Sequence, residues 1–263
     1  MEIVLSISKK EDLLLDSDYY IVGLKDYSDL FAMELNEFKD YEREKIFLAI
    51  NNNLTSKDAD NLLEILKDID AYNFKGIFFY DLGLISIKEK LGFKTPLILN
   101  QTHLVTNYQI INFYVPKYAS GAVLTPELSF EEIEEIINKT NAPLFIYLYA
   151  KNTLALSKRR LLSTYFGSDA LNHIKVKNND EEIIVKEAKE TKVYYNKVFN
   201  GTRLLNLDFN YGIIDAAFMD EALVKDLLKA LKEKDTAKLN ALAGPYHGFL
   251  DERLITRVKK WKK

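Results

Sequence analysis

The stretch PLFIYLY at Pro143–Tyr149 is apolar at almost every position, and GIFFY at Gly76–Tyr80 has the same character. Runs of this kind, without polar alternation, are typical of strands in a parallel sheet whose two faces are both covered by helices. A strand with one face in water would instead alternate apolar and polar side chains. These two runs therefore predict a parallel sheet inside a layer of helices.

Six further runs of strand type lie on either side of these two, separated by helical patterns. They are Glu2–Ile7, Tyr19–Leu24, Lys45–Ile50, Pro96–Asn100, Gly121–Thr125 and Gly212–Phe218. Eight strand–helix units in succession favour a closed TIM-like (β/α)₈ barrel, and a chain of 263 residues has the length of such a barrel. A doubly wound open sheet is the alternative, although no glycine-rich turn of the GxGxxG or GxxxxGK type follows any run.

Capping boxes predict where several helices begin, because a Ser or Thr followed three residues later by an acidic residue satisfies the first backbone N–H groups. The pairs are Ser8 with Glu11, Thr55 with Asp58, and Ser129 with Glu132. The eighth run leads into a further helix, predicted over Glu221–Lys232.

The regular alternation is interrupted between the seventh and eighth runs, at about residues 157–211. Within this stretch His173–Val176 and Glu182–Lys186 flank Asn178-Asn179-Asp180, a pattern that predicts a β-hairpin. We expect the stretch to be an insertion at the barrel mouth, within a single domain that spans residues 1–263. The chain ends in a basic tail at about residues 257–263.

The composition excludes several kinds of site. The chain has no cysteine, so disulfides, thiolate zinc sites, thiolate-held iron–sulfur clusters and cysteine nucleophiles are all excluded.

A net charge of -3 provides no global basic field for nucleic acid. Because Met1–Lys10 lacks the features of a signal peptide and no apolar run has the length of a membrane span, we expect a cytoplasmic protein without membrane contacts.

Functional groups in (β/α)₈ barrels lie just after the carboxyl ends of the strands, and polar residues at those positions are the candidates here. The candidates for acid–base catalysis are Asp81, His103, Glu127 and Asp215. The candidates for ligand binding are Asn51, Gln101, Asn107, Tyr149 and Lys151.

Each catalytic candidate also has a structural interpretation. Asp81 could cap the turn that follows it, and Glu127 could face a helix N-terminus. His103 could be a hydrogen-bonded structural group, and Asp215 could form an ion pair, because an unpaired carboxylate within an apolar strand is costly to bury. No two histidines have metal-ligand spacing, so we expect no metal site.

The sharpest local feature is the segment SKRRLLS at Ser157–Ser163, where Lys158, Arg159 and Arg160 are consecutive. Clustered cations suit a phosphate or a carboxylate, since guanidinium groups can make paired contacts with either. Tyr165 and Phe166 follow and could stack a nucleic-acid base. A solvated basic turn beside packed aromatic residues is the alternative.

Several segments together resemble peptidase family U32, the collagenase-like peptidases. They are Gly76–Gly83 (GIFFYDLG), Asn100–Tyr108 (NQTHLVTNY), Ala122–Ile133 (AVLTPELSFEEI), Ser157–Phe166 (SKRRLLSTYF), Asn200–Thr202, Gly248–Leu250 and Thr256–Lys260, in matching order across nearly the whole chain. Short members from Gram-positive bacteria, which pair with a longer paralogue, are the most similar. The resemblance implies a TIM-like barrel and either peptidase activity or hydroxylation of RNA bases. Some such members act on the wobble uridine of transfer RNA with prephenate involved, and some carry an iron–sulfur cluster.

The chain departs from the family pattern where this chemistry would lie. The His-Gly pair usual at the end of the seventh strand reads Tyr149-Ala150, and two common cysteine positions read Thr153 and Arg160. The arginine often found before the Glu-Leu-Ser motif is Pro126. We therefore expect no iron–sulfur cofactor, while a prephenate-like metabolite is implied by the resemblance alone.

Three functions stay open at this point. The first is a degenerate or partner subunit in transfer RNA modification of the wobble-uridine hydroxylation type, bound to a longer U32 paralogue and holding an anionic ligand with Lys158, Arg159 and Arg160. The second is a U32-type peptidase that uses Asp81, His103 and Glu127 as acid–base groups. The third is a non-catalytic barrel that binds a small anion or a protein.

Overall fold

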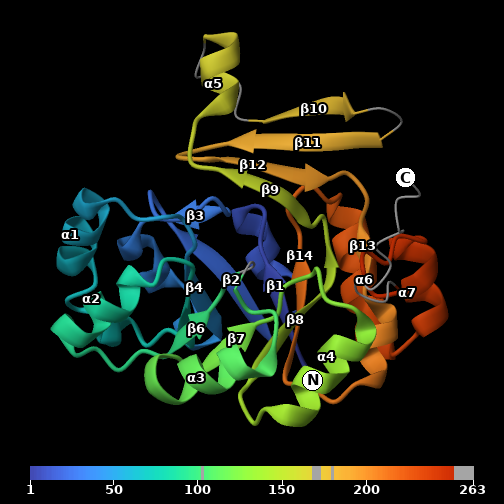
Figure 1. Cartoon of the computed structure of the whole chain (residues 1–263), viewed down its shortest axis with the longest axis horizontal. Coiled ribbons are helices and arrows are strands. Elements are labelled where there is room, and N and C mark those ends of the chain that lie inside the picture. Colours follow the sequence, from blue (N-terminus) through green and yellow to red (C-terminus); the bar gives the residue numbers. More distant parts are fainter. Residues whose placement is uncertain (102–103, 168–172, 179–180, 252–263) are drawn as a thin grey trace, which may run out of the picture.

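A computed structural model describes residues 1–101, 104–167, 173–178 and 181–251, and its centre is a closed barrel of parallel strands (Figure 1). The barrel strands are β1 (Glu2–Ser6), β2 (Tyr19–Leu24), β4 (Ile46–Ile50), β5 (Gly76–Phe79), β6 (Leu97–Leu99), β7 (Gly121–Val123), β8 (Leu144–Ala150) and β14 (Tyr211–Asp215). Each pairs with the next, and β1 closes the ring by pairing with both β14 and β2. The predicted barrel and its eight strands are confirmed, and the alternative of an open sheet is wrong.

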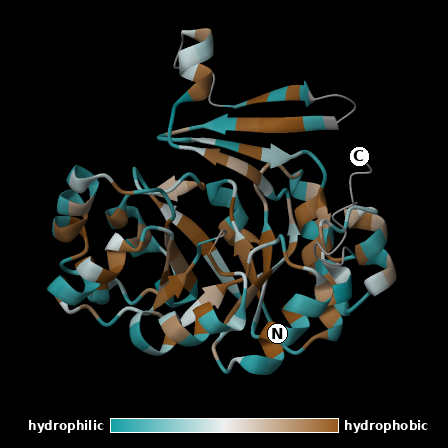
Figure 2. Cartoon of the chain, viewed as in Figure 1, coloured by the Kyte–Doolittle hydropathy of each residue, from teal (hydrophilic) through white to brown (hydrophobic). Residues whose placement is uncertain are grey.

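Apolar side chains fill the inside of the barrel, and Figure 2 shows how hydrophobic residues concentrate on its strands. The ring of Phe47 meets those of Phe78 and Phe145 edge to face, with centroids 5.2 Å and 5.4 Å away. Tyr211 stacks on Phe145 at 4.3 Å. The part of the barrel interior that these rings fill is therefore a packed core and not a channel. A functional site is then expected at the carboxyl ends of the strands.

Helices surround the barrel and bury their apolar faces against the outside of its strands. The α-helices of this layer are α1 (Ser56–Ile65), α2 (Gly83–Leu91), α3 (Tyr108–Tyr118), α4 (Phe130–Lys139), α6 (Glu221–Glu233) and α7 (Thr236–Ala243). Short 3₁₀ helices lie at η1 (Lys10–Leu14), η2 (Leu35–Asp40), η3 (Arg43–Lys45), η4 (Ile69–Tyr72) and η5 (Thr202–Asn206). None of the helices described here is long and apolar enough to cross a membrane.

Two of the predicted capping boxes are present, one with Thr55 and Asp58 at α1 and one with Ser129 and Glu132 at α4. The capping box predicted at Ser8 is wrong about the acidic residue, because Ser8 bonds with Asp12 and not with Glu11. The Ser8 hydroxyl and backbone N–H both donate to Oδ2 of Asp12, at 2.9 Å and 2.7 Å. The helix there is a 3₁₀ helix that begins only at Lys10. The acidic residue that accepts at its N-terminus is therefore Asp12, one position after the predicted Glu11.

The segment between β8 and β14 adds an antiparallel sheet beside the barrel mouth, which we call the insertion sheet (Figure 1). It is formed by β9 (Thr153–Ser157), β10 (His173–Asn178), β11 (Glu181–Glu187) and β12 (Thr191–Tyr195), in the order β10-β11-β12-β9. The predicted hairpin is present as β10 and β11, while Asn179 and Asp180 of its turn lie outside the described residues.

The insertion sheet begins earlier and ends earlier than the predicted span of residues 157–211. Its first strand, β9, follows β8 after only two residues, and the short strand β13 (Phe199–Asn200) already returns to pair with β8. Another two-residue strand, β3 (Ala32–Met33), extends the barrel sheet beside β2. The predicted basic tail lies outside the described residues.

Candidate functional site at the barrel mouth

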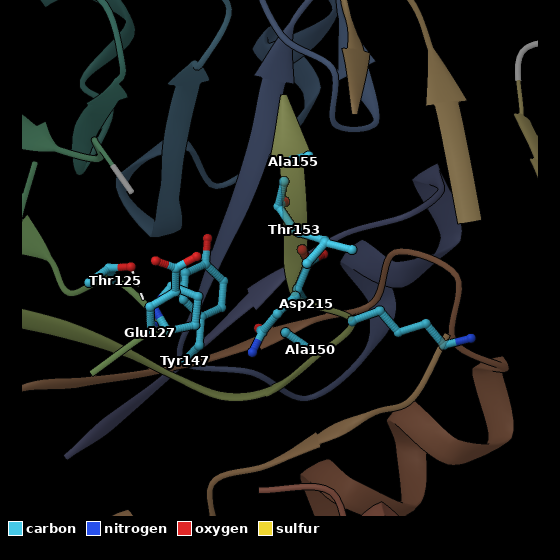
Figure 3. Close-up of a pocket in the computed structure, with 11 residues that line it drawn as sticks. Thr125, Glu127, Tyr147, Ala150, Thr153, Ala155 and Asp215 are labelled. Atoms are coloured by element: carbon cyan, nitrogen blue, oxygen red, sulfur yellow. Dashed lines mark hydrogen bonds between the residues drawn. The ribbon is translucent and has the colours of Figure 1, made fainter. Parts of the chain in front are cut away.

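Two adjoining cavities lie where the insertion sheet covers the carboxyl ends of the barrel strands. The first has a volume of roughly 70 Å³ and is lined by the ends of β7, β8 and β14 and by β9 (Figure 3). The second, also roughly 70 Å³, lies beneath β12 and shares Tyr147, Thr153 and Asp215 with the first. One water molecule needs about 10–15 Å³ of such space, so each cavity can hold several waters or a small ligand.

A buried ion pair fixes the insertion sheet over the second cavity. Nζ of Lys192, on β12, lies 2.9 Å from Oδ2 of Asp29 and 3.8 Å from Oε1 of Glu190. The Tyr194 hydroxyl donates to the same Asp29 oxygen at 3.1 Å. Burial alone would raise the pKa of Asp29, but the charges of Lys192 and Lys186 outweigh it and hold that pKa below its ordinary value. Asp29 is therefore a carboxylate that ties the insertion sheet to the loop after β2.

Asp215, the last residue of β14, lines both cavities. Its Oδ1 accepts a hydrogen bond from the backbone N–H of Ala217 at 3.1 Å, and within the described part of the chain it forms no ion pair. Burial raises the pKa of Asp215, and burial likewise raises the pKa of the adjacent Tyr147. A carboxyl group in its acid form can donate a hydrogen bond as well as accept one.

Two more of the predicted residues line the first cavity, Glu127 after β7 and Lys151 after β8. Figure 3 draws Glu127 and Tyr147 among the residues that line this cavity, and the Glu127 backbone N–H donates to Oγ1 of Thr125 at 3.4 Å. Nζ of Lys151 donates to Oδ1 of Asn196 at 2.7 Å. Burial, followed by the charge of Lys175, lowers the pKa of Lys151.

Asn51 lines the second cavity, but its side chain is already engaged. Its Oδ1 accepts hydrogen bonds from the Ser28 hydroxyl at 2.7 Å and from the Asp29 backbone N–H at 3.1 Å. Asn51 thus shapes the loop that carries Asp29. Together with Glu127, Lys151 and Asp215, it belongs to the predicted residues that the structure brings to the mouth.

Asp81 and Asn107 hold backbone turns instead of lining the cavities. Asp81 accepts from the backbone N–H groups of Leu54 at 2.9 Å and Gly83 at 2.8 Å, which is the capping role proposed as its structural alternative. Asn107 is the N-cap of α3. Gln101 accepts hydrogen bonds through its backbone carbonyl from Leu104 and Val105 and lines neither cavity.

Tyr149 lies outside the barrel wall, in the core beneath the helices. Its hydroxyl shares a hydrogen bond of 2.9 Å with Oγ1 of Thr202, and burial raises its pKa to about 12. The physical reason is a register shift between β8 and β14, where Ile213 pairs with Tyr147 but Ile214 pairs with Tyr149. The extra residue turns Tyr149 away from the mouth. His103 lies outside the described residues.

The three consecutive cations Lys158, Arg159 and Arg160 are exposed and lie between the end of β9 and the start of α5 (Leu161–Phe166) (Figure 1). They line neither cavity. Nε of Arg160 is 3.5 Å from Oε1 of Glu187. The cation cluster is thus a feature separate from the mouth.

Sequence reasoning missed the residues that close the mouth, namely Asp29, Tyr147, Lys192 and Tyr194. Tyr147 carried a usable signal, because it lies two residues after the inward-facing Phe145 on the same strand. Lys192 and Tyr194 carried none, since they come from an inserted sheet whose docking depends on tertiary structure. Across the described residues, no group of three or more His, Asp or Glu side chains could hold a metal ion.

One family model and one solved structure agree with this architecture. The model of peptidase family U32 matches residues 27–175. The structure of the U32 peptidase Mk0906 is similar with a TM-score of 0.51 and 14% identity, over 82% of this chain and 92% of that one, which shows a shared fold. A glycoside hydrolase family 18 N-acetylglucosaminidase from Paenibacillus barengoltzii gives a TM-score of 0.43 and 9% identity, over 89% and 99% of the two chains. A comparison with curated proteins gives no match.

Proposed function

Because this chain belongs to peptidase family U32, we propose that it serves transfer RNA modification in the cytoplasm, as a non-catalytic subunit that binds RNA. The reaction would be of the wobble-uridine hydroxylation type, with the chemistry performed by a longer U32 paralogue. The observation that carries the proposal is the insertion tip, residues 158–166, where Lys158 and Arg159 are exposed and Tyr165 is 83% exposed.

The insertion tip is held in place by a buried carboxylate. The side chain of Glu187 is only 2% exposed and accepts hydrogen bonds from the backbone N–H groups of Leu162 at 2.6 Å and Ser163 at 3.1 Å. Burial alone would raise the pKa of Glu187, but the hydrogen bonds from Ser163, Leu162 and Thr191 hold it below its ordinary value. This anchoring buries Leu162 while leaving the rings of Tyr165 and Phe166 exposed.

Such a surface matches the chemistry of single-stranded RNA. Cations bind the phosphate backbone and aromatic rings stack on unpaired bases, and both features lie together at the insertion tip. Arg160 also contacts Glu187, so we assign the phosphate contacts to Lys158 and Arg159. An anticodon loop offers unstacked bases and closely spaced phosphates of this kind.

The mouth supports a non-catalytic role for this chain in that reaction. Cavities of roughly 70 Å³ are far smaller than the about 300–1,000 Å³ of typical ligand pockets, so a nucleotide has no room there. A prephenate-like dicarboxylate also fits poorly, because it would meet the carboxylate of Asp29 while the nearby Lys192 is already paired. We therefore assign no step to such a metabolite in this chain.

A row of apolar residues crosses one face of the insertion sheet. Val193, Val185 and Ile174 pair in register across β12, β11 and β10, on the face opposite Lys192. All three are at least partly exposed, and none belongs to either core cluster of the described residues. Continuous apolar faces of this kind mark interaction sites, and we propose that the longer paralogue covers this one.

Fluorescence anisotropy with a labelled anticodon stem-loop tests the proposal, using this chain with and without the paralogue. The double variant Lys158→Ala/Arg159→Ala should weaken binding and reduce the slope of log affinity against log salt by about 2, since each phosphate contact contributes about 1. The matched control Lys225→Ala/Lys229→Ala removes the same charge from α6 and should leave binding unchanged. Equal losses in both variants, or no salt-dependent binding with either preparation, would overturn the proposal.

One observation favours a second candidate, the acid–base chemistry of a U32-type peptidase at the mouth. Asp215, with its raised pKa, and the exposed Glu127 line the same cavity, as a proton donor and a proton acceptor would. Cleavage of gelatin or a peptide library by the wild type, lost in Asp215→Asn, would support this candidate. Equal cleavage by both proteins would remove it.

A further inference from the structure

An open groove separate from the mouth lies between η5 and α7, which contact each other beside β13 (Figure 1). Its volume of roughly 780 Å³ is within the about 300–1,000 Å³ of typical small-molecule sites. Arg203 and Asn206 line it from η5, and Thr236 and Asn240 line it from α7. Residues three apart in a 3₁₀ helix and four apart in an α-helix share a face, so each helix presents a row of polar side chains to the groove.

A buried asparagine organises the floor and one end of this groove. Asn200 is 1% exposed, and its Oδ1 accepts from the backbone N–H of Thr202 at 3.1 Å and from the Thr202 hydroxyl at 2.6 Å. Its Nδ2 donates to Oδ1 of Asn240 at 3.0 Å and to the carbonyl of Gly244 at 2.7 Å. Its backbone carbonyl accepts from Nδ1 of His247 at 3.0 Å. One buried residue therefore holds four others that line the groove, and such preorganisation lowers the cost of binding a ligand.

The same hydrogen bonds decide which polar atoms can meet a ligand. Because Oδ1 of Asn240 accepts from Asn200, Nδ2 of Asn240 is the end that can donate. Asn206 donates through its Nδ2 to the Arg203 carbonyl at 3.2 Å, so its Oδ1 can accept. A carbonyl oxygen cannot donate, so Nδ1 of His247 carries the ring hydrogen, and Nε2 of the neutral ring is an acceptor. The groove thus combines donors and acceptors, which suits hydroxyl groups because they do both.

The charge of the groove favours an anionic group. Among the described residues that line it, Arg203 is the one with a permanent charge. Its guanidinium lies 4.1 Å from the centre of the Phe130 ring, and its Nη1 donates to Oδ1 of Asp251 at 3.0 Å. The side chains of Arg203 and Asp251 are 47% and 62% exposed, so a ligand anion can compete with this weak pair. A guanidinium has five N–H donors and binds phosphate well.

We propose that this groove binds a free sugar phosphate. The phosphate group accepts from Arg203 and from Nδ2 of Asn240, and the sugar hydroxyls donate to Oδ1 of Asn206 and Nε2 of His247. None of the residues that line the groove belongs to the insertion tip, so the site goes beyond RNA binding and is independent of it.

The test titrates ¹⁵N-labelled full-length protein with ribose 5-phosphate, ribose and inorganic phosphate, and follows the backbone amide shifts. We expect saturable shifts within residues 200–206 and 236–247 with ribose 5-phosphate. Ribose and inorganic phosphate should each bind at least about tenfold more weakly, because each lacks part of the contacts. Three results would overturn the proposal: no saturable shift with ribose 5-phosphate, equally tight binding of inorganic phosphate as an adventitious ion only, or tighter binding of an anticodon stem-loop at these same amides.

Two variants locate the site. Arg203→Gln should weaken ribose 5-phosphate binding at least about tenfold, because a charge-assisted contact with the phosphate is lost. The matched control Lys238→Gln removes the same charge from α7 at a position that does not line the groove, and binding should be unchanged. Arg203 is exposed, and the same spectra verify that both variants are folded.

The insertion-tip variant Lys158→Ala/Arg159→Ala should also bind ribose 5-phosphate unchanged, which separates failure of this site from failure of RNA binding. Undiminished ribose 5-phosphate binding by Arg203→Gln, or the same loss in Lys238→Gln, would contradict the assignment.

Discussion

Replacing Lys192 with methionine should destabilise the protein by about 3–5 kcal/mol at pH 7. The Lys192 ammonium lies 2.9 Å from Asp29 and 3.8 Å from Glu190, and the three side chains are 15%, 6% and 5% exposed. Methionine keeps most of the length of the side chain but removes its charge, so two buried carboxylates lose their cation. The same change in a solvent-exposed pair would cost only about 0–1 kcal/mol, so burial sets the magnitude.

Urea unfolding followed by circular dichroism measures this difference in the free energy of unfolding. The control is Lys229→Met, which removes an ammonium 3.9 Å from Glu233, in a pair whose side chains are 66% and 50% exposed. We expect the control to lose less than about 0.5 kcal/mol. The free energy of unfolding lost in the double variant Asp29→Asn/Lys192→Met should be smaller than the sum of the losses in the two single variants, because the two side chains interact directly.

The pH dependence gives an independent check of the same pair. The folded-state pKa of Asp29 lies below its ordinary value of 3.8, so its contribution is present above that pH and is lost as the pH falls through the folded value. Lys192→Met should therefore reduce the acid-induced loss of stability. A cost below about 1 kcal/mol for Lys192→Met at pH 7, or one equal to that of Lys229→Met, would refute the inference that this buried pair fixes the insertion sheet.

Three further substitutions test the barrel, a helix cap and the mouth. Phe145→Ala removes a ring that is 1% exposed and stacked on Tyr211, and should cost about 3–5 kcal/mol in urea unfolding; a loss below about 1 kcal/mol would contradict the packed interior. Ser129→Ala removes the N-cap of α4 and should cost about 1 kcal/mol, whereas an unchanged midpoint would show that the cap contributes nothing. Asp215 has a raised folded-state pKa, so the wild type should lose stability as the pH rises from 3.8 through that value. Thermal unfolding of Asp215→Asn across this range should lack that loss, and parallel pH profiles for the two proteins would exclude the raised pKa.

The barrel could be predicted from the sequence because its signal is local. Apolar runs such as Gly76–Tyr80 and Pro143–Tyr149 show burial on both faces, and the number and spacing of such runs then lead to a closed ring. The hairpin at β10 and β11 was also predictable, since its turn residues are local. The 3₁₀ helix after β1 was not, because a difference of one residue in where a helix starts is decided by packing.

The candidate site could be predicted only in part. Strand-end position correctly placed Asn51, Glu127, Lys151 and Asp215 at the mouth, because all parallel strands end at the same rim. The direction of a side chain depends on register as well, and the irregularity between β8 and β14 turned Tyr149 outward.

Contacts between residues far apart in the chain could not be predicted from the sequence. The pair of Asp29 and Lys192 joins residues 163 positions apart, and only the docking of the insertion sheet brings them together. The same docking decides that the cations before α5 line neither cavity.

Photo-crosslinking of the protein to transfer RNA, followed by mass spectrometry of the crosslinked peptides, tests the central functional claim most directly. RNA bound at the insertion tip would place crosslinks within residues 158–166, with Tyr165 and Phe166 as the main sites because their exposed rings can stack on bases. Crosslinks confined to residues around the two cavities, or absent from the insertion tip, would contradict the claim.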